Sequence, residues 1–73
     1  MTKDQMIYFQ KLTTLPERAA FLLNIGVTAK TNIVDLCVVS QACVGDVLLP
    51  VAADSDDLAI NKGIAWLEEK IRG

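Results

Sequence analysis

The chain of 73 residues has no histidine, only two cysteines and two prolines, and four aromatic residues in all. Without histidine it has no imidazole for acid–base catalysis or for metal ligation. Cys37 and Cys43 are six residues apart, and on a helix that spacing does not allow a disulfide. Two thiolates also supply only half of a tetrahedral metal shell. We therefore expect no metal and no cofactor, and we interpret both cysteines as small buried apolar residues of a cytoplasmic protein.

Basic residues are also few and scattered. The seven Lys and Arg residues are outnumbered by nine Asp and Glu residues, which gives a net charge of −2. After Lys30 the next basic residue is Lys62, whereas binding to a phosphate backbone needs clustered Lys and Arg. We expect no direct contact with nucleic acid. The chain also has no glycine-rich phosphate loop, and no base lies beside either thiol in the sequence, so we predict that it is not an enzyme.

One stretch is apolar enough to suggest a membrane anchor. Residues 33–53 contain no Lys or Arg. They do contain Asp35, Asp46 and Pro50, and a carboxylate at mid-bilayer costs about 2.5–3.5 kcal/mol. The first five residues do not resemble a signal peptide, because they include Asp4 where an apolar run would have to begin. We therefore favour a buried segment of a cytoplasmic protein and keep a membrane-embedded protein as the alternative.

Capping patterns predict two short helices in the first third of the chain. Thr2 with Gln5, and Thr14 with Glu17, both have the spacing of a capping box. Gly26 suits the left-handed position that ends a helix, so the second helix is expected to stop there.

The final segment gives the clearest helical pattern. Asp54 or Ser55 is expected to cap it, and Gly73 lies just beyond its end. Its apolar residues recur at helical spacing and predict one buried stripe: Ile60, Ile64, Leu67 and Ile71.

The segment between these helices permits two interpretations. From Thr28 or Thr31 to Val44 it is rich in β-branched residues, which favours a strand. It shows no clean alternation of apolar and polar residues, however, and we predict a third helix that is apolar around most of its circumference. Residues 45–54 are predicted to form an extended connector or a short extra turn, because a helix rarely continues through the residue before Pro50.

These elements predict an all-α protein in which residues 1–73 form a single helical domain, a small bundle of four short helices. Three short partners cannot cover the whole of the third helix, so we expect a homodimer that buries part of it. The residues predicted at that interface, or at the surface for another protein, are Val34, Val38 and Cys43. Tyr8 is added because only one of Tyr8 and Phe9 can readily face the core.

The N-terminal residues resemble the opening of the Hha/YmoA proteins, small helical modulators that bind a nucleoid protein. The resemblance lies in Met1-Thr2-Lys3 and in Gln10-Lys11-Leu12-Thr13-Thr14-Leu15. It covers roughly the first 18 residues with one gap, and the acidic–histidine segment of that family is absent. It implies an indirect transcription modulator that acts through a DNA-binding partner. Our main prediction is broader: a small non-enzymatic accessory or regulatory protein that occupies the surface of another protein.

Overall fold

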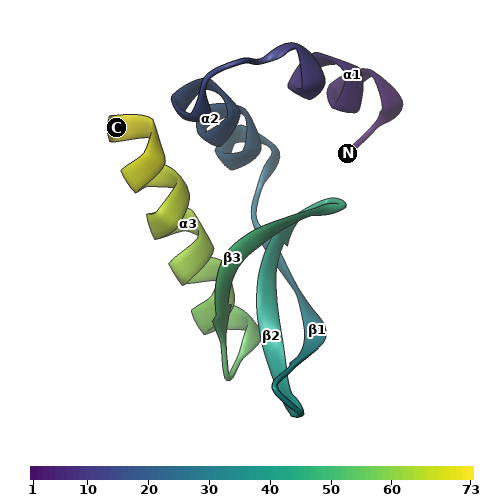
Figure 1. Ribbon diagram of the computed structural model, residues 1–73, viewed down its shortest axis with the longest axis vertical. Helices are drawn as coiled ribbons and strands as arrows, with labels where there is room; N and C mark the ends of the chain where they lie inside the picture. Colours follow the sequence, from purple (N-terminus) through teal and green to yellow (C-terminus); the bar gives the residue numbers. More distant parts are fainter.

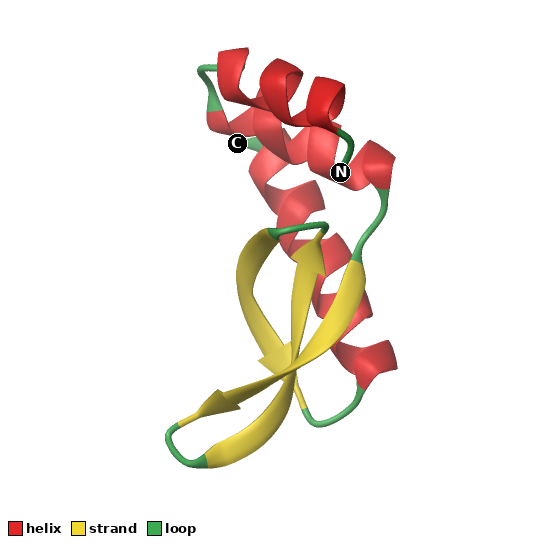
Figure 2. Ribbon diagram, turned by 90° about the vertical axis from the view of Figure 1, so that its right-hand side faces the viewer, coloured by secondary structure: helices red, strands yellow, loops and turns green.

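The computed structural model describes residues 1–73 and shows an α+β fold in place of the predicted all-α bundle. The elements in chain order are α1 (Lys3–Lys11), α2 (Leu15–Ile25), β1 (Thr28–Val34), β2 (Cys37–Val44), β3 (Val47–Ala53) and α3 (Asp56–Arg72). The three strands form one antiparallel sheet in the order β1-β2-β3. Helix α3 runs along one face of this sheet, and α1 and α2 lie at one end of the molecule (Figure 1). No helix lies over the opposite face of the sheet (Figure 2).

The first two helices begin at the residues that their caps predict. The Thr2 side chain accepts from the Gln5 amide, and the Gln5 side chain accepts from the Thr2 amide, so the first capping box is confirmed. Thr14 accepts from the Glu17 amide, but its hydroxyl donates to the Glu17 carboxylate, so the second box is only half formed. Helix α2 ends at Gly26, whose φ of 115° is readily available to glycine alone.

Helix α3 has the predicted ends but a different buried stripe. Ser55 caps it by accepting from the Leu58 amide. Its buried residues are Ala59, Gly63 and Leu67, so only Leu67 of the predicted stripe is fully buried. Small residues let the helix approach the sheet closely: a Cβ on Gly63 would lie 2.8 Å from the Ala42 Cβ atom.

The predicted third helix is wrong, because those residues form the β1–β2 hairpin. Seven residue pairs join the two strands without interruption, from Thr28↔Cys43 to Val34↔Cys37. The turn consists of Asp35 and Leu36, both with positive φ (51° and 66°), as a type I′ turn requires. The predicted connector after Gly45 is strand β3, which pairs with β2 across an irregularity between Gln41 and Cys43.

The core lies between the sheet and the helices α2 and α3. Six buried residues form it: Ala19, Leu22, Ala42, Val44, Leu49 and Leu67. Residues 33–53, the alternative membrane anchor, lie in the end of β1 and in β2 and β3. None of the helices combines the length and the apolar character that a membrane crossing needs. The helical fold implied by the Hha/YmoA resemblance is also contradicted by the sheet.

Candidate functional site

The β1–β2 hairpin extends beyond the helix that covers the rest of the sheet. The Ser40 hydroxyl donates to the Asp56 carboxylate at 2.6 Å, which fixes the start of α3 against the middle of β2. Beyond that contact, toward the turn, the two strands have no helix beside them (Figure 1). The end of the hairpin therefore projects from the body of the molecule.

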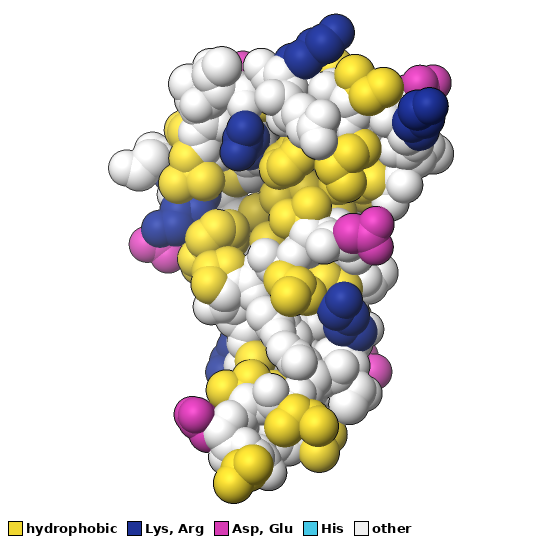
Figure 3. Space-filling model, turned by 45° about the vertical axis from the view of Figure 1, so that its right-hand side comes forward, with side chains coloured by type: hydrophobic (Ala, Val, Ile, Leu, Met, Phe, Trp, Pro, Cys, Tyr) yellow, Lys and Arg dark blue, Asp and Glu magenta, His cyan; other side chains and the backbone are white.

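Apolar side chains gather on this projecting end. Ile33 and Val38 are a cross-strand pair on the same face of the sheet as α3, and they are 68% and 70% exposed. Val34 lies on the opposite face, and Leu36 occupies the turn. We call these four residues the hairpin tip. Figure 3 shows the exposed apolar atoms at this lower end of the molecule. Other apolar side chains are exposed elsewhere, among them Leu48 and Leu58, and Figure 3 shows apolar atoms farther up the molecule as well. The hairpin tip places four of them on one projecting end, which is typical of a surface that contacts another protein.

The turn itself is conformationally costly. A residue with a Cβ in the left-handed region loses about 1–2 kcal/mol relative to the right-handed one, and aspartate tolerates that region better than leucine. Leu36 nevertheless holds a φ of 66° while its side chain is 97% exposed. The strain is therefore not offset by burial within the chain. Backbone strain of this kind is typical of functional segments.

The structure brings together two of the four residues that the sequence predicted for an interface. Val34 and Val38 lie on the hairpin tip. Cys43 is in the buried part of β2, only 3% exposed, with its sulfur 3.4 Å from the Thr28 hydroxyl. The prediction that both cysteines are buried is wrong for Cys37, which is exposed beside the turn. Tyr8 lies on α1, at the opposite end of the molecule (Figure 1). Sequence reasoning missed Ile33 and Leu36, because the turn at Asp35 and Leu36 lacks the glycine that marks most type I′ turns.

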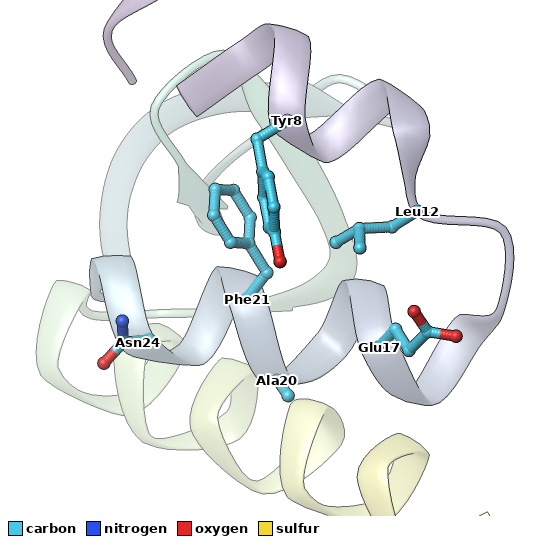
Figure 4. A pocket seen from close by; sticks show the side chains of 6 residues that line it. All are labelled: Tyr8, Leu12, Glu17, Ala20, Phe21 and Asn24. Atoms are coloured by element: carbon cyan, nitrogen blue, oxygen red, sulfur yellow. The ribbon is translucent and has the colours of Figure 1, made fainter. Parts of the chain in front are cut away.

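Tyr8 belongs to a separate hollow between α1 and α2. Figure 4 shows its ring beside Phe21 and its hydroxyl directed into the hollow, and the two ring centroids are 5.1 Å apart. The hollow has a volume of about 350 Å³ and is bordered by Glu17, whose carboxylate accepts from the Thr14 hydroxyl, and by Asn24. It offers a mixed apolar and polar lining with a single carboxylate.

The acidic side chains and the cysteines do not form a metal-binding cluster anywhere in the molecule. Fewer than three Cys, Asp or Glu residues come together at any point where they could hold a metal ion. The ten buried residues include no polar or charged side chain. The feature that distinguishes this surface is therefore the exposed and strained apolar hairpin tip.

Comparison of the chain with models of known protein families, with curated proteins and with solved structures finds no match.

Proposed function

We propose that this chain is a small non-enzymatic protein-binding module, an accessory or regulatory protein that docks on another protein through its hairpin tip. The observation that supports this proposal is Leu36, a fully exposed leucine held in a left-handed conformation at the end of a projecting hairpin. A solitary exposed apolar residue would need no explanation. Leu36 is accompanied by three further apolar side chains, and together they form a convex knob that fits a recess.

The chemistry of the tip defines the partner. The recess must be apolar and wide enough to take Leu36 together with Ile33 or Val34. Asp35 is the only charged residue between Lys30 and Asp46, and it is exposed beside the tip. A lysine or arginine at the rim of the recess would complement its carboxylate and fix the orientation of docking. We place this interaction in the cytoplasm, because Cys37 is exposed and unpaired on the same hairpin, which suits a reducing compartment.

The proposal is tested by cross-linking from the tip. A photoreactive amino acid is placed at position 36 in the full chain, and at position 65 in a control, because Ala65 is exposed on α3 away from the hairpin. In source cells the position-36 probe should give a discrete adduct with one protein, and the position-65 probe should not. Equal labelling from both positions would count against docking through the tip.

The protein identified by the cross-link then allows a quantitative test. Burial of a leucine side chain contributes about 1.5–3 kcal/mol, so Leu36→Gly should raise the Kd for the purified partner by about 10- to 150-fold. Leu15→Ala is the control, because Leu15 is also an exposed leucine, although only 52% exposed, and lies at the start of α2. An unchanged Kd for Leu36→Gly would contradict the proposal.

A further inference from the structure

The two edges of the sheet differ in how they are protected. The outer edge of β3 contains Pro50, and its pairing with β2 is interrupted by an irregularity; both features are typical of edges that do not accept another strand. Strand β1 contains neither: its seven residues pair regularly with β2, and none is proline. Its outer side has no neighbouring element (Figure 1).

The turn fixes which backbone groups of β1 face outward. Residues that flank a two-residue hairpin loop exchange both backbone hydrogen bonds, and the pairs then alternate along the ladder. Val34 and Cys37 flank the turn, so the amides and carbonyls of Ile33, Thr31 and Ala29 point away from β2. The Ile33 amide agrees with this alternation: the amide donates to the side chain of Asn32 at 2.9 Å and not to β2.

From this pattern we infer that the partner of the β1 edge is a second copy of the chain, joined antiparallel with Thr31 opposite Thr31 on a two-fold axis. The three outward residues are spaced symmetrically about Thr31, which is also the middle of Thr28–Val34. In this register Ala29 exchanges hydrogen bonds with Ile33 of the second copy, and Thr31 with its own equivalent. The Ile33 amide exchanges its bond to the Asn32 side chain for one to the Ala29 carbonyl. The two sheets become one sheet of six strands.

Side chains favour this register over its neighbours. Lys30 lies opposite Asn32 of the second copy, whereas a shift that centres the pair on Lys30 would oppose two like charges. The exposed Ile33 lies opposite the small, half-buried Ala29, so a large side chain meets a small one. Both α3 helices then lie on one face of the joined sheet, with Ile33 and Val38 of each copy directed to that face between them.

This inference goes beyond the proposed function, because strand pairing uses the backbone of residues 28–34 and the docking of another protein depends on Leu36.

Light scattering behind a sizing column, over a range of concentrations, should give a mass of about twice 8.0 kDa. Thr31→Pro removes only an outward amide, so it should preserve the fold and raise the dimer dissociation constant more than tenfold. Thr31→Val keeps the amide and is the matched control. Leu36→Gly should leave the mass unchanged.

A cysteine variant tests the register without relying on the fold of a proline variant. In a Cys37→Ser background, Thr31→Cys should form a disulfide-linked dimer under mild oxidation, because hydrogen-bonded antiparallel pairs place Cα atoms about 5.5 Å apart, within disulfide range. Ala65→Cys in the same background should not. A wild-type monomer at all concentrations would overturn the inference. A dimer that survives Thr31→Pro would also overturn the inference, as would equal cross-linking at residues 31 and 65. Strand pairing of β1 with a different protein only would overturn it as well.

Discussion

Replacement of Leu36 by glycine should stabilise the isolated chain even though it removes an apolar side chain. The side chain is 97% exposed, so its loss removes almost no buried area. Glycine removes the cost of the left-handed conformation, which stabilises the folded chain by about 1–2 kcal/mol. The greater conformational freedom of glycine in the unfolded chain offsets about 0.5–1 kcal/mol of this gain. The net expectation is an increase of about 0.5–1 kcal/mol in the free energy of unfolding.

Thermal unfolding followed by circular dichroism measures this change directly. In a domain of this size 1 kcal/mol corresponds to about 4–8 °C in Tm, so Leu36→Gly should raise Tm by about 2–8 °C. Leu36→Ala keeps the strained conformation and should leave Tm nearly unchanged. The same glycine variant is expected to bind the partner more weakly, so stability and binding should move in opposite directions. A fall in Tm for Leu36→Gly would show that Leu36 contributes contacts to the folded chain, so its exposed position would no longer indicate a partner.

Three further predictions concern α3, and urea unfolding measures each of them. The control is Ala65→Ser, an exposed change on the same helix, whose free energy of unfolding should stay within about 0.5 kcal/mol of wild type. Gly63→Ala should destabilise the chain by about 1–3 kcal/mol, because its Cβ would lie 2.8 Å from Ala42 and 2.9 Å from Val27; a neutral result would mean that α3 lies farther from the sheet. Leu67→Ala should cost about 2–5 kcal/mol by opening a cavity at a fully buried position, and a loss of under 1 kcal/mol would contradict that packing. Ser55→Ala should cost about 1 kcal/mol through loss of the bond to the Leu58 amide, and no change would show that the cap is dispensable.

The helices were predictable because their signals are local. The Thr2 side chain and the Gln5 amide are within one turn of each other, as are Ser55 and the Leu58 amide, and each bond forms whatever the rest of the chain does. The buried stripe of α3 was not predictable in the same way. Ala59 and Gly63 are buried, whereas Ile60 and Ile64 are not fully buried. This difference depends on how closely the sheet approaches the helix, which the local sequence does not indicate.

The sheet was missed because its hairpin turn does not resemble one. When the segment from Thr28 or Thr31 to Val44 is taken as a single element, the alternation of faces breaks at Asp35 and Leu36, and the absence of a clean alternation favours a helix. With those two residues assigned to a turn, each flanking strand keeps a consistent pair of faces. Asn-Gly in their place would have predicted the hairpin, so the residue that misled the prediction is the strained leucine on which the proposed function depends.

The distribution of apolar residues connects this error to the function. The core combines small side chains such as Ala19 and Ala42 with larger ones such as Leu49, whereas Ile33 and Leu36 lie at the surface. A short chain selected only for its own stability would place its large aliphatic residues inside, where each contributes about 1.5–3 kcal/mol. In this chain the four apolar side chains of the hairpin tip are exposed instead. Under the two proposals made above, the hydrophobicity that suggests a buried third helix serves burial against other protein surfaces: a recess for Leu36 and a second copy along β1.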